Sequence, residues 1–170
     1  MRYVFWLVAG ELCGRPGPNQ QPWNLQEMRD AGIGGILSVN RADSVCEDEL
    51  AAADIKHACI PLAANAPAIA GDLELCLERL PRAYEFARAH VERGSSVLVH
   101  CRHGKDRTGL FMAYYLLRRD KLSVEEAISP RAARGRRTGG ARRRPSGRRW
   151  RRWDQWGRRD RWGRWDQWGR

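Results

Sequence analysis

Residues 131–170 contain no Leu, Ile, Val, Met or Phe, a gap that limits where this chain can build a hydrophobic core. Without such side chains neither a helix nor a strand presents an apolar face to the rest of a domain. The sequence therefore predicts one folded domain in residues 1–128, a length that suits a single core. Residues 129–170 are predicted to form a disordered, low-complexity tail rich in Arg, Gly and Trp.

The net charge divides at the same place. The whole chain carries +11, but residues 129–170 hold 16 Arg against three Asp, while residues 1–128 hold 15 basic and 17 acidic residues and so carry −2. A basic segment with interspersed Trp suits RNA or an anionic membrane, through counterion release and base stacking. We do not expect a nucleic-acid partner for residues 1–128, and the tail is the only segment whose charge suits one.

The tail also repeats itself, since residues 152–158 recur as residues 164–170. Three interpretations stay open: a nucleic-acid-binding segment, a solvated appendage without a function, and the product of a frameshift in GC-rich DNA. In the third case the helix that opens at Val124 is cut short. The C-terminal end of the domain is then incomplete, and we expect the domain to be less stable than an intact one.

Apolar runs without helical periodicity alternate with amphipathic segments, which predicts an α/β domain whose central, largely parallel sheet is flanked by helices. The expected strands are residues 3–9, 33–39, 57–62 and 96–100, with a Gly- and Pro-rich loop at residues 14–18. The expected helices are a short one capped by Asn24, one through residue 53 with a Ser44–Glu47 capping box, residues 72–94, residues 110–117, and one opened by a Ser123–Glu126 capping box. In the longest helix Asp72 is the expected cap, and the expected apolar face is Leu73, Leu77, Leu80, Tyr84 and Ala87.

No apolar run approaches the roughly 18 to 20 residues that a membrane-spanning helix needs. Five cysteines form an odd set without metal-binding spacing or a disulfide-dense pattern, and Cys13, Cys46, Cys59 and Cys76 are interpreted as small buried apolar residues. A reducing cytoplasm is the expected compartment.

The most informative stretch is residues 100–109, which read His-Cys-Arg-His-Gly-Lys-Asp-Arg-Thr-Gly between an apolar strand and an amphipathic helix. A cysteine at a strand end, five residues, and an arginine at a helix start form a cradle for one anion, because loop amides, the helix N-terminus and the Arg107 guanidinium all converge on it. Gly104 permits the backbone conformation of such a loop. In that field the Cys101 thiol should ionise more readily than usual, which predicts a nucleophile facing a bound phosphate.

These ten residues resemble the signature loop of the cysteine-based protein-tyrosine and dual-specificity phosphatases, HCxxGxxRTG, and especially small bacterial members that end in GKDRTG. The resemblance implies that Cys101 attacks phosphorus to form a phosphocysteine, that Arg107 binds the phosphate, that Thr108 donates to the leaving sulfur, and that His100 orders the loop. It implies no metal and no cofactor. A rhodanese-type sulfurtransferase also holds a cysteine in an anion cradle, but its loop seldom ends in Arg-Thr-Gly.

The general acid departs from the family pattern. Members commonly place an aspartate in the loop after the third strand, but this chain has Asn65 there, which supplies no proton at neutral pH. Two candidates remain, Asp106 within the signature loop and Asp72 further along. We favour Asp106, because the GKDRTG subgroup is thought to use its loop aspartate in this way.

The phosphate-binding set is predicted to be Arg102, His103, Gly104, Lys105, Asp106 and Arg107. The basic side chains of this loop exceed what one phosphate requires, and phosphoinositide phosphatases show a similar enrichment. The resemblance to the dual-specificity phosphatases implies phosphotyrosine, phosphoserine or phosphothreonine in proteins as the substrates. The alternatives are a phosphoinositide, or an Arg-rich RNA-binding protein whose catalytic domain is vestigial.

Overall fold

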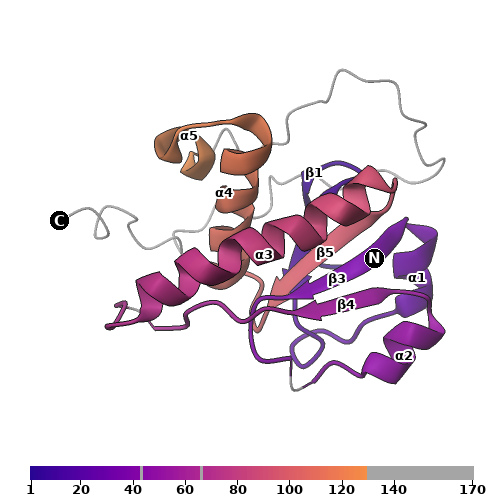
Figure 1. Ribbon diagram of the computed structural model, residues 1–170. Helices are drawn as coiled ribbons and strands as arrows, with labels where there is room; N and C mark the ends of the chain where they lie inside the picture. The colour runs from indigo at the N-terminus through magenta and orange to yellow at the C-terminus, as the bar shows by residue number, and fades with distance from the viewer. Residues whose placement is uncertain (43, 66, 130–170) are drawn as a thin grey trace. The chain divides into compact units, whose positions relative to one another are not determined.

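The computed structural model describes residues 1–42, 44–65 and 67–129, and its strands form one mixed sheet (Figure 1). The strand order is β1-β2-β5-β3-β4. Neighbouring strands from β2 to β4 are parallel, and β1 pairs with β2 in an antiparallel hairpin at one edge. The strands are β1 (Phe5–Val8), β2 (Leu12–Pro16), β3 (Ile33–Ser38), β4 (Lys56–Cys59) and β5 (Ser96–Cys101). The predicted fold class, a largely parallel sheet flanked by helices, is confirmed.

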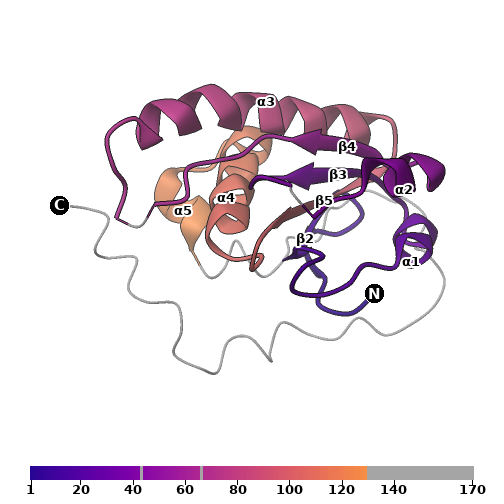
Figure 2. The same ribbon diagram turned by 90° about the horizontal axis from the view of Figure 1, so that it is seen from below.

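Helices cover both faces of this sheet. Figure 2 shows α3 lying along one side of β4, β3 and β5. Residues of α3, α4 and α5 share one hydrophobic cluster, and residues of α1 and α2 share the other. The helices are α1 (Leu25–Asp30), α2 (Glu47–Ala52), α3 (Asp72–Glu92), α4 (Asp106–Asp120) and α5 (Val124–Ile128).

The central strand β5 explains why the sheet needs two layers of helices. All six of its residues are buried. Val97, Val99 and Cys101 belong to the cluster under α3 and α4, whereas Leu98 belongs to the cluster under α1 and α2. Because successive side chains in a strand point to opposite faces, a continuous apolar run is satisfied only when both faces are covered.

The structure corrects the expected loop at residues 14–18, since β2 runs through its first half. Gly14 pairs with Phe5 on one side and Val99 on the other. An added Cβ at Gly14 would lie 2.5 Å from the Phe5 ring and 2.7 Å from the end of Met112, so these side chains fill the space beside the glycine. Gly14 therefore marks a place where other side chains approach the strand closely, and not a turn.

Two of the expected helix caps are confirmed, and two are wrong. The Asn24 side chain accepts a hydrogen bond from the amide of Glu27 at 2.9 Å, and the Ser123–Glu126 capping box is complete. The Ser44–Glu47 capping box does not form, because α2 begins at Glu47 behind Cys46, which makes no side-chain cap bond. Gly71, with φ +88°, is the cap of α3, and Asp72 is its first residue.

Some boundaries also differ from expectation. The strand expected at residues 57–62 is β4 (Lys56–Cys59), and the helix expected at residues 110–117 is α4 (Asp106–Asp120). The α4 helix starts four residues before the expected position. Its first turn is the end of the signature sequence, and the polar residues there lack the apolar periodicity on which the prediction of a helix depends. These shifts matter for the site, since they place Asp106 and Arg107 in the first turn of a helix.

The first turns of α3 do not pack as the apolar periodicity predicts. Leu80, Ala83 and Ala87 are buried, but Leu73 and Leu77 are each 65% exposed. A helix of 21 residues is about 31 Å long, whereas a strand of six residues spans about 20 Å. The N-terminal part of α3 therefore extends beyond the sheet, as Figure 1 shows, and its apolar stripe has no sheet beneath it.

The predictions for the tail concern residues outside those that the structure describes. These are its disorder, its binding of RNA and its origin in a frameshift, and all three remain predictions. Among the described residues, no helix is both long enough and apolar enough to cross a membrane.

Candidate active site

The signature loop, residues 100–109, joins the buried end of β5 to the start of α4. Cys101 is the last residue of β5 and is only 3% exposed, and α4 begins five residues later at Asp106. Gly104 adopts a left-handed conformation with φ +69°. The N-terminus of a 15-residue helix is thereby aimed at the loop that follows the cysteine, and its free amides and partial positive charge favour an anion.

Gly104 is fixed by close contact with the end of β2. A Cβ at this position would lie 2.6 Å from the carbonyl carbon and oxygen of Arg15 and 2.7 Å from the nitrogen of Pro16. On the other side of the same contact, the Gly17 amide donates to the Arg102 carbonyl at 3.1 Å. The segment after β2 therefore packs against the signature loop and holds it in position. The sequence alone did not predict this role.

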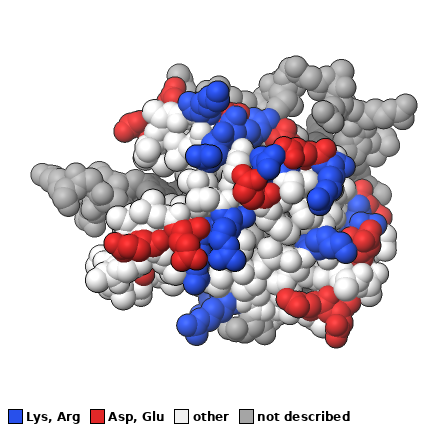
Figure 3. Space-filling model, viewed as in Figure 1, with Lys and Arg blue, Asp and Glu red and all other residues white. Residues whose placement is uncertain are grey.

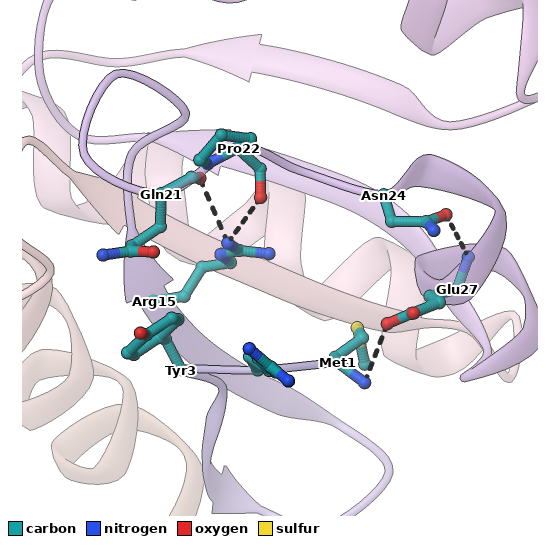
Figure 4. Close-up of a pocket in the computed structure, with 8 residues that line it drawn as sticks. Met1, Tyr3, Arg15, Gln21, Pro22, Asn24 and Glu27 are labelled. Atoms are coloured by element: carbon teal, nitrogen blue, oxygen red, sulfur yellow. Dashed lines mark hydrogen bonds and ion pairs between the residues drawn. The ribbon is translucent and has the colours of Figure 1, made fainter.

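Arg15 holds this supporting segment in place. It is 4% exposed, and its Nη2 donates to the carbonyls of Gln21 and Pro22, both at 3.2 Å (Figure 4). Burial lowers the pKa of Arg15. In the same segment, the Trp23 ring lies nearly perpendicular to the ring of the signature residue His100, with 4.8 Å between ring centroids.

The pocket of Figure 4 lies beside Arg15 and contains no residue of the signature loop. Its lining consists of Met1, Arg2, Tyr3, Arg15, Gln21, Pro22, Asn24 and Glu27. It is therefore separate from the candidate active site.

His100 is buried in the centre of the sheet. Its Nδ1 donates to the carbonyl of Cys101 at 3.3 Å, and its Nε2 lies 2.6 Å from the Ser38 hydroxyl. Burial lowers the pKa of His100 to about 4, and the hydrogen bond to the Cys101 carbonyl opposes this shift. The imidazole is therefore neutral at pH 7, which suits the expected role of ordering the loop without transferring a proton.

Thr108 lies in the first turn of α4 and is completely buried. Its hydroxyl has no hydrogen-bond partner within the part of the chain that the structure describes. A buried hydroxyl normally makes a hydrogen bond. The Thr108 hydroxyl can therefore still donate to an acceptor that becomes charged during a reaction. This observation suits donation to the Cys101 sulfur, which stays a prediction.

The remaining signature side chains lie at the protein surface. Arg107 is half-buried in the first turn of α4, whereas Arg102, His103, Lys105 and Asp106 are exposed. The loop thus brings a buried cysteine, a half-buried arginine and several solvated charges into ten residues. Their predicted roles in catalysis and phosphate binding remain predictions.

Asp72, the second candidate for the general acid, is engaged in organising its own loop. Its carboxylate accepts from the Asn65 side-chain amide at 3.0 and 3.1 Å and from the Ile69 amide at 2.9 Å. Asn65 stands where the family pattern places an aspartate, and here its amide serves to hold Asp72. Asp106, by contrast, is exposed in the first turn of α4.

The other cysteines do not share one environment. Cys13 is fully buried, and burial raises the pKa of its thiol well above the usual range. Cys46 and Cys59 are exposed, so the interpretation that both are buried apolar residues is wrong. Cys46 directly precedes α2, and Cys59 is the last residue of β4, which is an edge strand of the sheet.

Charges of both signs are mixed over the face seen in Figure 3. This distribution agrees with the slight negative charge of residues 1–128. The described part of that face therefore has no extended basic surface of the kind that nucleic acids require.

The order of the elements and the signature loop between β5 and α4 place the domain among the cysteine-based phosphatases. The family model for the dual specificity phosphatase catalytic domain matches residues 19–140, so the chain belongs to this family. The match runs past residue 128, the end that we expected for the domain. No curated protein sequence matches the chain.

Solved structures give the same fold. The chain is similar to Tk-PTP in the active form, with 20% identity, a TM-score of 0.58, and coverage of 81% of this chain and 86% of that one. It is also similar to PTPMT1 in complex with PI(5)P, with 19% identity, a TM-score of 0.60, and coverage of 74% and 79%. Human DUSP28 matches with 18% identity, a TM-score of 0.58, and coverage of 79% and 80%.

Proposed function

We propose that this protein hydrolyses phosphate monoesters through a phosphocysteine at Cys101. The observation that carries the proposal is the buried cysteine at the end of a central strand, followed by a loop with a left-handed glycine and by the N-terminus of a long helix. This arrangement stabilises a tetrahedral anion beside a sulfur atom.

The proposed reaction has two steps. The Cys101 thiolate attacks phosphorus, the bond from phosphorus to the leaving oxygen breaks, and Asp106 gives its proton to that oxygen. Water then attacks the phosphocysteine, Asp106 takes a proton from the water, and phosphate leaves as the Cys101 thiolate is restored. Arg107 binds two phosphate oxygens in both steps, Thr108 donates to the departing sulfur, and His100 orders the loop.

We propose phosphotyrosine, phosphoserine and phosphothreonine in proteins as the substrates, in line with the family. A second candidate is a phosphoinositide, and the exposed side chains of Arg102, His103 and Lys105 favour it. Each additional phosphate on an inositol ring needs its own cation, and this loop offers several. One structural neighbour, PTPMT1, was solved in complex with PI(5)P, which supports the same candidate for a related fold.

Hydrolysis of an aryl phosphate by the full chain tests the proposed reaction. We expect activity that vanadate blocks and that Cys101→Ser abolishes, whereas Cys59→Ser, which alters an exposed cysteine on β4, retains it. Loss of activity in both variants, or in neither, would overturn the assignment of Cys101. Comparing a phosphotyrosine peptide with a phosphoinositide then distinguishes the two substrate classes.

The general acid is tested by comparing Asp106→Asn with Asp72→Asn. Loss of a positioned acid costs about 10²- to 10⁴-fold in rate. We expect this loss, together with a change in the basic limb of the pH profile, for Asp106→Asn only. A pH profile that neither substitution alters would exclude both residues.

We also propose that residues 1–128 form the catalytic part and that residues 129–170 contribute nothing to hydrolysis. A chain ending at residue 128 should retain the aryl phosphatase activity. If the tail is instead an RNA-binding segment, salt-sensitive RNA binding by the full chain should disappear with it.

A further inference from the structure

A row of hydrogen bonds leads from the signature histidine across the sheet to the protein surface. His100 Nε2 lies 2.6 Å from Ser38 Oγ, Ser38 Oγ lies 2.9 Å from His57 Nε2, and His57 Nδ1 lies 3.1 Å from Glu47 Oε1. These residues come from β5, β3, β4 and the first turn of α2, and Ser38 is directly paired with His100 in the sheet. Neighbouring strands therefore align the polar groups.

The direction of each bond in this row follows from what the atoms can donate. The Cys101 carbonyl only accepts, so His100 Nδ1 carries a proton. Since burial keeps His100 neutral at pH 7, its Nε2 is an acceptor, and the Ser38 hydroxyl must donate to it. Ser38 has a single proton, so its oxygen accepts from His57 Nε2.

The contact with Glu47 determines which ring nitrogens of His57 must donate if every bond in the row is to form. A carboxylate only accepts, so His57 Nδ1 donates to Glu47. All the bonds form together only when both ring nitrogens of His57 carry protons, as an imidazolium paired with Glu47. With a neutral His57, either the Glu47 contact becomes repulsive or His57 Nε2 competes with His100 for the one proton of Ser38.

We propose that Ser38, His57 and Glu47 are positioning residues that hold His100 in a single tautomer and, through it, fix the carbonyl of Cys101 at the base of the signature loop. The residues act through His100 and do not touch the substrate. The ionisable groups that act electrostatically on His100 are His57 on β4 and Arg15 on β2, and the Glu47 carboxylate on α2 lies 3.1 Å from His57 Nδ1. The assignment to catalysis rests on the proposed function, but the tautomer of His100 does not.

The two ends of this row differ in burial. A substitution at Ser38 therefore affects the core, whereas a substitution at Glu47 does not. Ser38 is completely buried, so removal of its hydroxyl leaves His100 Nε2 without a donor and without water. The Glu47 side chain is 78% exposed, so its substitution does not disturb the core. Glu47→Gln keeps an oxygen acceptor but removes the charge that holds the His57 imidazolium.

The test measures the ring protons and the thiol separately in the full chain. Ring-nitrogen NMR of histidine-labelled protein at pH 7 should show His100 protonated at Nδ1 only and a hydrogen-bonded proton on His57 Nδ1. In Glu47→Gln and Ser38→Ala these patterns should change. The pH dependence of Cys101 alkylation by iodoacetamide, followed by peptide mass spectrometry, should shift as well. Turnover of an aryl phosphate should fall on the order of tenfold, which is the size of effect expected when one hydrogen bond of the row is lost.

Two controls keep the proposal falsifiable. Glu49→Gln changes an exposed carboxylate on the same helix and should leave both measurements as they are. Ser38→Thr restores a hydroxyl and should recover the His100 tautomer if Ser38→Ala fails to fold or loses it. An unchanged tautomer and alkylation profile in folded Glu47→Gln and Ser38→Ala would overturn the proposal. If the unaltered chain shows the stated proton pattern but hydrolyses no phosphate, the proposed function fails and the positioning row stands.

Discussion

Gly104→Ala tests whether the signature loop depends on its contact with the end of β2. The substitution has two separable costs. A left-handed conformation costs an alanine about 1–2 kcal/mol, because its Cβ approaches the following carbonyl oxygen. The Cβ would also lie 2.6 Å from the Arg15 backbone, and relief of such overpacking costs about 1–3 kcal/mol. We expect a total loss of about 2–5 kcal/mol in the free energy of unfolding.

Gly94→Ala is the matched control, because it carries the first cost without the second. Gly94 has φ +81°, and a Cβ there would have nothing within 4 Å. Urea unfolding followed by circular dichroism should therefore show a loss of about 1–2 kcal/mol for this variant. The difference between the two variants measures the contact with β2 alone.

Activity provides the second readout of Gly104→Ala. Restoring an ordinary 3.4 Å contact requires the loop to move by about 0.8 Å, and a misplacement of about 1 Å in a catalytic site costs on the order of 10²-fold in rate. Gly94→Ala should keep the rate of aryl phosphate hydrolysis. The reasoning is refuted if Gly104→Ala is as stable and as active as Gly94→Ala.

Three further predictions follow from buried or paired groups. Because the pKa of His100 is about 4 in the folded domain and about 6.5 when unfolded, its stabilisation is complete above pH 6.5 and is lost as the pH falls through about 4, by up to about 3 kcal/mol. Urea unfolding at pH 7 and pH 4.5 should show a smaller drop for His100→Asn, and an equal drop would contradict this. Arg119 donates to both oxygens of Glu11 at 2.7 and 3.0 Å in a half-buried pair, so Glu11→Gln should cost about 1–2 kcal/mol, against under about 0.5 kcal/mol for the exposed Glu78→Gln. Ser123→Ala removes the hydroxyl of a complete capping box and should cost about 1 kcal/mol in a thermal melt; an unchanged melting temperature would show that α5 adds nothing to stability.

Local features of the sequence predicted the position of the signature loop, between the end of β5 and the start of α4. The apolar run at residues 96–100 and the polar signature after it lie within one strand–loop–helix unit, so the position of Cys101 at the end of β5 depends on neighbours in the chain. The same is true of the Asn24 and Ser123 caps, whose partners are three residues away.

The parts that sequence analysis missed depend on contacts between distant segments. Gly14 and Pro16 carry the local signals of a turn, and only pairing with β5 and the Phe5 ring makes that segment a strand. Likewise no local pattern links Ser38 or His57 to the signature loop. They gain significance because the strand order brings them to His100, which is 62 residues from Ser38 in the chain.

The position of β5 in the middle of the sheet has a consequence for how Cys101 becomes exposed when the domain unfolds. Two strands lie on each side of it, so its backbone amides are released to solvent only when the whole sheet comes apart, and edge fraying leaves them protected. Hydrogen exchange at residues 97–101 should therefore report the global opening of the domain. Exposure of Cys101 and loss of the sheet on heating are then one event, and the Cys101 thiol is among the last groups in the fold to be exposed.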